Sequence, residues 1–570
     1  MKVQLRESNE NYQEGLVHGD PVLNRIFRSR GVQSPDELKY DLNKLLPPNF
    51  KDMDKATDII VKNIYAEAKI RVIGDYDADG ATSVAVASRF FTEIKYDNFD
   101  YYIPSRKDEG YGVNREIVDK AKSDKVDLII TVDNGISAID VIDYAKSLGI
   151  SVIITDHHIP QDVLPNADAI VNPHQKDCMF ASKCIAGVGV IFYVLSCTCT
   201  KLKKKGYFEE RQIVPPLMSS FLDLVSIGTI SDMVPMDFNN RIMCDFGVKL
   251  VRTKKSLTGI LELVMASGCT LIGFKTTDIS FYICPRLNAA GRIDDMRHGV
   301  ELLIDTDKTK AKSKANYLNY LNNKRKQIEK EMRQIADRKI INDYGVKTNN
   351  GIVIYDQSFN IGVVGILANK LKEQHKTPII VLTDTSATEI SGSCRSTDAL
   401  NIHEILTLMN EENEGLIVAF GGHKKAAGLT IKKEKLEIFS ELFSKYVEKY
   451  SSSIEESTIV TDGVLPVSYL DLSFARYICF DQPWGQDFEA PTFIGDFWVL
   501  SQYASSSSLL RFNFALENGE QIQGLYFSFD ETKWPNSNAK KVRIVYSLSC
   551  SSNSERGKVS LIIRHIEALQ

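Results

Sequence analysis

The chain has 570 residues, of which 43% are hydrophobic and 25% charged, and this balance is typical of a globular protein with several domains. Its formal net charge of −5 excludes a strong overall field that attracts nucleic acid, so any polyanion site must be a local basic patch. Ten scattered cysteines without a C-x2-C pair, no signal-peptide segment and no apolar run long enough to cross a bilayer indicate a protein of the reducing cytoplasm with no membrane partner.

Three short apolar runs in the first third of the chain each lead into acidic residues or histidines. The runs 70–74, 128–132 and 151–155 are β-branched and lack polar alternation, which is typical of strands buried on both faces of a parallel sheet. Because the carboxyl ends of such strands meet at one edge, the polar residues that follow should share a crevice. These residues are Asp75, Asp77, Asp79, Asp133, Asp156, His157 and His158. So many carboxylates would repel one another without cations among them, so the sequence predicts a metal site.

Three other interpretations of the first acidic cluster are weaker. Its D-x-D-x-D-G pattern matches the opening of an EF-hand, but Val86 stands where that loop needs a bidentate Glu, and a strand precedes it instead of a helix. A dinucleotide-binding turn would need G-x-G-x-x-G, and Gly74 and Gly80 do not provide it. One Asp at a strand end is usually a turn former or helix cap, but three successive clusters favour the metal site.

The residue types indicate which ions and which chemistry fit the crevice. Mg²⁺ and Mn²⁺ prefer carboxylates and water, and Mn²⁺ also accepts imidazole. Asp77, Asp79, Asp133, His157 and one further acid would suffice for two ions. That acid is Asp232, which follows a helical stretch and precedes a turn, or Asp223, which fits a partly buried helix position better. Paired ions suit metal-assisted hydrolysis of phosphoesters, and a single structural metal is the weaker alternative.

The pattern of elements divides the chain into several parts. Strand and helix patterns alternate from about residue 69 to 232, which predicts a doubly wound α/β domain. Residues 305–344 contain no Gly or Pro and show helical spacing, so they predict a helix of roughly 50 Å that bridges two domains. The lysines of that helix fit solvation and DNA contact equally well. The expected parts are an N-terminal extension (1–50), a first α/β lobe (51–306), the connecting helix (307–344), a second α/β lobe (345–450), a linker (451–457) and a small β-barrel, plausibly an OB-fold (458–570).

Some further segments could bind phosphate, although none is specific alone. Residues 393–396 place hydroxyls beside a guanidinium, which is either an anion fork or a surface turn. Residues 421–428 offer backbone amides and an imidazole. We expect residues 286–292 to form a loop with two arginines and an asparagine, and Arg106 on its own fits a solvated charge.

Taken together, these motifs resemble the DHH phosphoesterase superfamily and, within it, the RecJ family of bacterial exonucleases specific for single-stranded DNA. The resemblance runs through most of the chain, at residues 74–82, 131–137, 155–158, 186–190, 285–292, 362–368, 421–428 and 483–486. It implies an α/β fold of two lobes, DHH and DHHA1, joined by a long helix and followed by an OB-fold barrel. It also implies 5′→3′ degradation of single-stranded DNA to mononucleotides in recombination and repair, with two divalent ions, Mg²⁺ or Mn²⁺.

The resemblance assigns roles to particular residues. One ion would be held by Asp77, Asp133 and Asp75, and the other by Asp79, Asp133, His157 and Asp232, with His158 facing the scissile phosphate. Ser393 and Arg395 match the family's pocket for the 5′-terminal phosphate. The strand's path would be lined by Arg106, Asn288, Arg292 and His423. Implied partners are single-strand-binding protein and a helicase of the RecQ type, and we expect a monomer.

Two departures from the family pattern and two competing functions remain. Some relatives carry a histidine ligand where this chain has Ile73, and many have Trp-His where it has Phe359-Asn360.

A DHH hydrolase of short oligonucleotides, cyclic dinucleotides or pyrophosphate would generally lack the segment 458–570. A non-catalytic scaffold, like the related component of the eukaryotic replicative helicase, would have lost acids that this chain retains.

Overall fold

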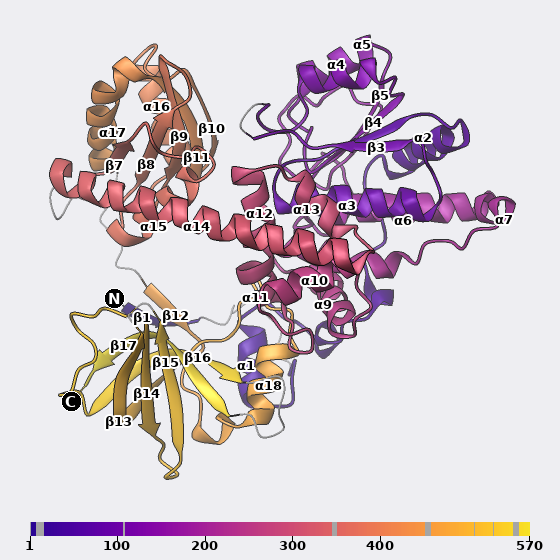
Figure 1. Cartoon of the computed structure of the whole chain (residues 1–570). Helices are drawn as coiled ribbons and strands as arrows, with labels where there is room; N and C mark the ends of the chain where they lie inside the picture. The colour runs from indigo at the N-terminus through magenta and orange to yellow at the C-terminus, as the bar shows by residue number, and fades with distance from the viewer. Residues whose placement is uncertain are drawn as a thin grey trace.

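The computed structural model describes residues 2–6, 16–106, 109–344, 350–450, 458–506, 508–527, 529–550 and 558–569. Two lobes lie side by side and are joined by one long helix, and a barrel lies against the first lobe (Figure 1). The expected linker at 451–457 lies outside the described residues. None of the described helices combines the length and the apolar character needed to span a bilayer.

The first lobe is built on the predicted parallel sheet. Its strands are β2 (Ile70–Ile73), β3 (Phe99–Tyr102), β4 (Leu128–Val132), β5 (Ser151–Thr155) and β6 (Ala169–Val171), in the order β3-β2-β4-β5-β6. One face is covered by α2 (Met53–Tyr65), α3 (Ala78–Glu93) and α6 (Gly187–Lys204), and the other by α4 (Arg115–Ser123) and α5 (Ile139–Ser147). The order reverses between β2 and β4, so the crevice opens where these two strands end.

The expected alternation of strand and helix up to residue 232 is wrong beyond Val171, because the described remainder of the first lobe is helical. Its helices are α7 (Tyr207–Arg211), α8 (Leu222–Ser231), α9 (Phe238–Arg252), α10 (Thr258–Ala266), α11 (Thr276–Asp278), a π-helical turn η4 (Ile279–Ile283), α12 (Cys284–Ile293) and α13 (Arg297–Leu303), with a short 3-10 turn η3 (Met218–Phe221).

The loop expected at 286–292 is also wrong, because these residues lie within helix α12. Pro285 stands in the first turn, where a missing N–H costs nothing. Gly291 allows close packing, since a Cβ there would lie 1.9 Å from the carbonyl oxygen of Tyr76. Both residues look like helix breakers in the sequence and instead fit the helix into its surroundings.

The connecting helix α14 (Lys308–Tyr344) has 37 residues and bridges the two lobes as expected (Figure 1). Ala311, Ala315 and Leu318 pack into the core of the first lobe. Met332, Ala336 and Ile340 pack into the core of the second. Its two ends are therefore buried against different lobes.

The second lobe holds a mixed sheet in the order β10-β11-β9-β8-β7. Its strands are β7 (Ile352–Tyr355), β8 (Ile379–Asp384), β9 (Glu389–Arg395), β10 (Ala419–His423) and β11 (Ala426–Lys432), and only β7 and β8 are parallel. Its helices are α15 (Val364–His375), α16 (Ile402–Glu412) and α17 (Leu436–Tyr450), with a 3-10 turn η5 (Lys433–Lys435). Helix α15 packs against β8 and β9, so its first turn lies close to the end of β9.

The C-terminal part contains the predicted β-barrel, which is closed and has five strands. Its strands are β13 (Phe493–Ser506), β14 (Leu509–Ala515), β15 (Gln521–Phe527), β16 (Lys541–Cys550) and β17 (Val559–Ala568), preceded by the turn η6 (Val467–Tyr469) and α18 (Leu472–Phe480).

The N-terminal extension packs on this C-terminal part. Strand β1 (Lys2–Leu5) pairs in parallel with β12 (Thr458–Thr461), and α1 (Pro21–Arg28) is followed by the turns η1 (Pro35–Leu38) and η2 (Leu42–Lys44). The buried guanidinium of Arg30 forms two hydrogen bonds with Asp462. The extension therefore ties the barrel to the rest of the chain.

Candidate active site

The first acidic cluster lies where β2 turns into α3. Asp77 caps the helix, because its Oδ1 accepts hydrogen bonds from the backbone N–H groups of Asp79 (2.9 Å) and Gly80 (3.0 Å). Asp79 lies in the first turn of α3 and accepts from Gly187 (2.7 Å) and Val188 (3.0 Å) at the start of α6. Two helix N-termini thus converge on Asp79, and their N–H groups partly oppose the rise in its pKa that burial causes.

Asp133 follows β4 at the reversal of strand order. The register pairs Ile73 with Thr131, so Asp133 lies beside Asp75 at the same sheet edge. Its φ of 60° is in the left-handed region, and its carbonyl oxygen accepts a hydrogen bond from the Tyr111 hydroxyl at 3.1 Å. A Cβ at Gly187 would lie 2.7 Å from the Asp133 Cβ, so only glycine permits α6 to begin this close to the carboxylate.

The two histidines follow β5 and are held by Asp156. Its Oδ1 accepts from the His157 backbone N–H at 2.7 Å and lies 2.7 Å from His158 Nδ1. Its Oδ2 accepts from the Ile136 N–H at 3.0 Å. Asp156 is fully buried and both of its carboxylate oxygens make these contacts, so it orients the histidines.

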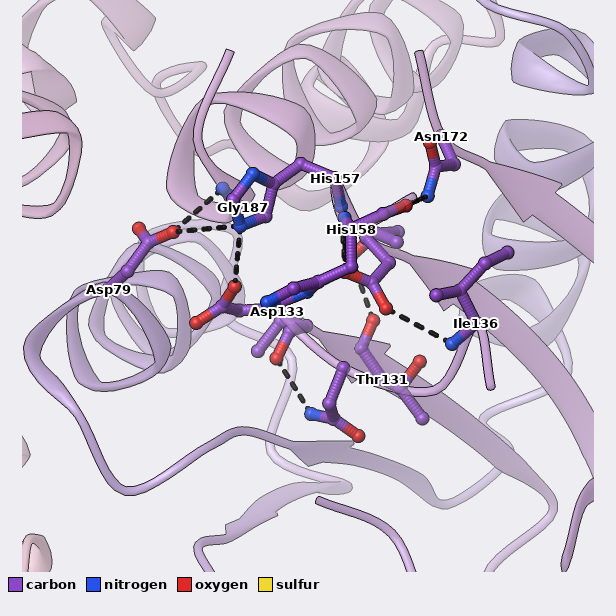
Figure 2. Close-up of polar contacts among 12 residues, drawn as sticks. Asp79, Thr131, Asp133, Ile136, His157, His158, Asn172 and Gly187 are labelled. Atoms are coloured by element: carbon purple, nitrogen blue, oxygen red, sulfur yellow. Dashed lines mark hydrogen bonds and ion pairs between the residues drawn. The ribbon is translucent and has the colours of Figure 1, made fainter. Parts of the chain in front are cut away.

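The ring of His157 lies among three carboxylates. Its Nε2 is 3.1 Å from Asp133 Oδ1, 3.4 Å from Asp232 Oδ2 and 4.0 Å from Asp79 Oδ2. Figure 2 shows the ring between Asp79 and Asp133. Four chain segments therefore meet at one imidazole.

The positions of Asp232 and Asp223 show which of the two acids lies in the candidate metal site. Asp232 follows the last residue of α8 and joins the cluster around His157. Asp223 is fully buried inside the lobe, where its Oδ2 accepts from the Ser256 hydroxyl at 2.7 Å and the Leu257 N–H at 3.1 Å. Asp223 is a structural residue of the helix, and it is more deeply buried than the sequence indicates.

The donor atoms of the described residues form three groups, of which one joins Asp133 to Asp156, His157 and His158. The other two are adjacent and suit hard cations. In each, one ligand atom per residue lies within 4.8 Å of the others: Asp75, Asp77 and Asp133 in the first, and Asp79, His157 and Asp232 in the second. Three of these atoms, Asp75 Oδ1, Asp133 Oδ1 and His157 Nε2, are buried and make no hydrogen bond with the described residues. Buried polar atoms are rarely left unpaired, so the donor set fits divalent ions.

Burial and mutual repulsion shift the titration of this cluster. Burial, with the charge of Asp77 added, raises the pKa of Asp75 to about 8 and that of Asp232 to about 7. Burial also raises the pKa values of Asp79 and Asp133, and neighbouring carboxylates add to the rise. Burial and His158 lower the pKa of His157 to about 4, which leaves its ring neutral. A neutral imidazole and crowded carboxylates are what a metal site requires.

His158 behaves differently from His157. Burial opposes its charged form, but the hydrogen bond and charge of Asp156 outweigh that effect and raise its pKa to about 9. Its side chain is 42% exposed, compared with 12% for His157. His158 is therefore a cationic, accessible neighbour of the acidic cluster.

The structure brings Arg106, Asn288 and Arg292 to the rim of this cluster. Arg106 lies with its guanidinium carbon 3.9 Å from the centre of the Tyr76 ring, and its Nε donates to the Gly291 carbonyl at 3.2 Å. Asn288 Oδ1 accepts from the Ala78 N–H at 2.9 Å, and Arg292 Nη1 donates to the Gly362 carbonyl at 3.1 Å. Arg106 is thus fixed in place and is not the freely solvated charge that the sequence alone favours.

Ser393 and Arg395 lie at the end of β9 beside the first turn of α15. A Cβ at Gly365 in that turn would lie 3.1 Å from both Ser393 Oγ and Arg395 Nη2. A hydroxyl, a guanidinium and helix N–H groups thus converge, which suits a phosphate better than the surface-turn alternative does.

The remaining predicted positions lie elsewhere. His423 is exposed at the end of β10, and no contact within the described residues joins it to the other candidates. Ile73 is fully buried in the sheet core, and Asn360 Oδ1 accepts from the Gly362 N–H at 2.9 Å. Neither departure from the family pattern disturbs the acidic cluster.

A large cavity extends from the cluster toward the barrel. It has a volume of about 960 Å³, and Asn288, Arg292 and Arg325 line it on the side of the lobes. Thr492 and Arg564 line it on the side of the barrel. The cavity therefore lies between Asn288 and Arg292, at the rim of the acidic cluster, and the C-terminal part.

Sequence reasoning missed two aromatic residues at this site. Tyr76 lies under Arg106, and the half-exposed ring of Tyr111 lies edge-on to Tyr76 and to His158. Gly110 and Gly112, which flank Tyr111, both have positive φ values. Two glycines around one aromatic residue were the available signal of a constrained loop.

Comparisons with known proteins agree with this arrangement. Family models match in chain order: the N-terminal domain of the DHH family at residues 69–229, the DHHA1 domain at 348–449 and the RecJ OB domain at 461–565. Over 550 residues, which are 95% of each chain, the sequence is 38% identical to the "Single-stranded-DNA-specific exonuclease RecJ" of Salmonella typhimurium.

Two solved structures are also similar. RecJ of Thermus thermophilus in complex with Mn²⁺ aligns with a TM-score of 0.79 at 24% identity, covering 97% of this chain and 77% of that one. An exonuclease RecJ bound to manganese aligns with a TM-score of 0.59 at 28% identity, covering 71% of this chain and 96% of the other. The first of these supports the fold, and the second supports the fold and the kind of site.

Proposed function

Because the chain belongs to the RecJ family of single-stranded-DNA-specific exonucleases, we propose that it hydrolyses single-stranded DNA from the 5′ end to mononucleotides, in DNA recombination and repair. The observation that carries the proposal is the meeting of two groups of metal-type ligands beside Asp133, close to Asn288 and Arg292, which line a cavity that reaches the barrel. A non-catalytic scaffold would not need unpaired buried donors there.

The reaction uses two divalent ions, Mg²⁺ or Mn²⁺, and a relative of known structure is bound to manganese. Asp75, Asp77 and Asp133 would hold one ion, and Asp79, Asp133, His157 and Asp232 would hold the other. When bound, such a pair supplies hydroxide at neutral pH and neutralises charge on the phosphate. The chain contributes Asp133 as the shared carboxylate, and Asp156 keeps His158 protonated and aimed at the scissile phosphate.

The positive residues around the cluster guide the strand. Ser393, Arg395 and the first turn of α15 bind the 5′-terminal phosphate. The path of the strand is lined by Arg106, Asn288, Arg292 and His423. Burial lowers the pKa of Arg292 to about 10, and the nearby charges of Arg106 and Arg325 add to this effect. A bound polyanion reduces the repulsion among these arginines.

Each part of the chain, with the bounds expected from the sequence, has its own role in the reaction. Residues 51–306 carry the catalytic acids, 345–450 the 5′-phosphate pocket and 458–570 an OB-type surface for single strands. The helix 307–344 fixes the distance between the lobes, and residues 1–50 brace the barrel. We infer a monomer that works in the cytoplasm with single-strand-binding protein and a helicase of the RecQ type.

End-labelled oligonucleotides test the proposal. With Mg²⁺ or Mn²⁺, a 5′-labelled single strand should release labelled mononucleotide at once, while a 3′-labelled one shortens progressively. A blunt duplex and a chelator-treated reaction should stay intact, and Asp133→Asn serves as the control for contaminating nuclease. Turnover that resists chelator, or release from the 3′ end first, contradicts the proposal. Cleavage confined to dinucleotides would favour the short-substrate hydrolase.

A further inference from the structure

A second, smaller hollow lies along the connecting helix, and we call it the connector groove. It has a volume of about 450 Å³ and lies between α14, the first turn of α12 and helix α15. Five cationic side chains line it: Arg325, Lys326, Lys330, Arg333 and Lys370. The protein as a whole is acidic, so this concentration of positive charge is local.

The charges of the groove are not balanced from within. Glu329 is its one acidic lining residue among those described, and it is buried against Arg325 and Lys370. Arg333 Nε lies 3.7 Å from Asp337 Oδ2, and Asp337 does not line the groove. No ion pair within the described residues involves Lys326 or Lys330. Burial lowers the pKa of Lys326, and the nearby cations Arg286 and Arg325 lower it further, although Glu329 opposes them. Such crowding favours a bound polyanion.

The groove continues the large cavity of the active site. Phe281, Pro285 and Arg325 line both, and the large cavity also contains Asn288 and Arg292. A strand that leaves the acidic cluster past Arg292 therefore meets Arg325 and the entrance of the groove. Continuity with these residues favours DNA over an acidic peptide as the occupant.

An exposed aromatic side chain stands at the junction. Phe281 is 75% exposed and belongs to the π-helical turn η4, directly ahead of α12. π-helical turns occur frequently at functional sites. An aromatic ring beside cations is the usual platform for a base of a single strand.

We propose that the connector groove binds the sugar-phosphate backbone of the DNA strand downstream of the catalytic site, with Phe281 stacking on a base at the junction. The inference rests on the proposed exonuclease function and adds a second contact region, along α14, to the one at the barrel. It also divides the lysines of this helix into those that contact DNA and those that are solvated.

Charge reversal with a matched control tests the proposal. Lys326→Glu/Lys330→Glu removes two groove cations, and Lys308→Glu/Lys312→Glu makes the same change at the same spacing on exposed positions of α14 outside the groove. Binding is measured by fluorescence anisotropy in chelator, so that no strand is cut, with oligonucleotides of about 6 and about 30 nucleotides. Thermal melting confirms that each variant is folded.

The groove variant should bind the long strand at least tenfold more weakly than the control variant does, and the short strand within twofold. Its log–log dependence of affinity on salt should be less steep by about 1.4, since each lost contact to a single strand removes about 0.7. Phe281→Ala should weaken long-strand binding by about 5- to 150-fold, the range for one stacked base.

Equal affinities of the groove and control variants for the long strand at every salt concentration would overturn the proposal. So would a groove variant that keeps DNA binding but loses binding of an oligoglutamate probe, since that result identifies an acidic peptide as the occupant. If the wild-type protein digests no single strand with Mg²⁺ or Mn²⁺, the proposed function fails. If it digests them and the groove variant matches the control, this inference alone fails.

Discussion

His157 Nε2 lies 3.1 Å from Asp133 Oδ1, and neither atom makes a hydrogen bond within the described residues. Asp133 also belongs to the group with Asp75 and Asp77, so one carboxylate touches both groups of donors. A shared carboxylate is the usual bridge between two ions held about 3.5–4 Å apart.

Asp133→Asn should therefore lower the rate of digestion by about 10³-fold or more, since several kcal/mol of charge stabilisation depend on the metal pair. Asn tolerates the left-handed backbone at this position, so the fold should persist. Binding of single strands should be retained, which anisotropy measures beside the rate. Appreciable metal-dependent turnover by this variant would show that Asp133 does not bridge.

The metal-free protein should lose stability as pH rises from about 4 to 8. Unfolded aspartates release their protons near pH 4, whereas the folded pKa values are about 8 for Asp75 and about 7 for Asp232. Across that window the folded state binds more protons than the unfolded state, so the free energy of unfolding falls with increasing pH. Melting in chelator should show this fall, and Mn²⁺ should raise Tm more at pH 8 than at pH 5.5.

The variant Asp75→Asn/Asp232→Asn provides the control for this pH dependence. It lacks the two carboxyl groups whose raised pKa values make stability depend on pH, so its melting temperature in chelator should vary less with pH. A wild-type curve as flat as that of the variant would mean that the cluster does not hold protons in the absence of metal.

Arg395→Ala should reduce the preference for a 5′-phosphorylated end. Hydrogen bonds to charged groups contribute roughly 1.5–3 kcal/mol, so the preference should fall by about tenfold or more. Competition between 5′-phosphate and 5′-hydroxyl strands measures it, with the hydroxyl strand as internal control. Loss of activity by the same factor on both strands would place Arg395 outside the end-binding pocket.

Arg30→Leu should destabilise the C-terminal part by about 3–5 kcal/mol, because it leaves the carboxylate of Asp462 buried without its partner. All three tryptophans, Trp484, Trp498 and Trp534, lie in this part, so urea unfolding followed by tryptophan fluorescence reports on it. The double variant Arg30→Leu/Asp462→Leu should recover most of the loss.

Arg25→Leu, which removes an exposed hydrogen bond, should cost about 0.5 kcal/mol. Similar costs for Arg30→Leu and Arg25→Leu would contradict the role of the buried pair.

The parts of the site that the sequence predicts are those set by local patterns. Strands β2, β4 and β5 could be predicted because their buried runs are short, β-branched and uninterrupted. Their shared edge then follows from the geometry of a parallel sheet, and it placed Asp75, Asp133 and His157 together. The position of Asp232 followed from the end of a helix and the turn after it.

The parts that the sequence could not predict depend on distant contacts. Asp79 is held by N–H groups more than a hundred residues away, at Gly187 and Val188. The sequence predicts a loop where helix α12 lies, because Gly291 looks like a helix breaker. This glycine instead allows the helix to pack closely on the Tyr76 carbonyl oxygen, and no local pattern reveals that contact. The pairing of β1 with β12 joins segments that are far apart in the sequence and has no signal in either strand alone.

Anomalous diffraction from crystals grown with Mn²⁺ tests the central claim most directly. The account predicts two peaks, one among Asp75, Asp77 and Asp133 and the other among Asp79, His157 and Asp232, with Asp133 in contact with both. A map with no peak in either group, or with a single ion that Asp133 does not touch, would contradict it.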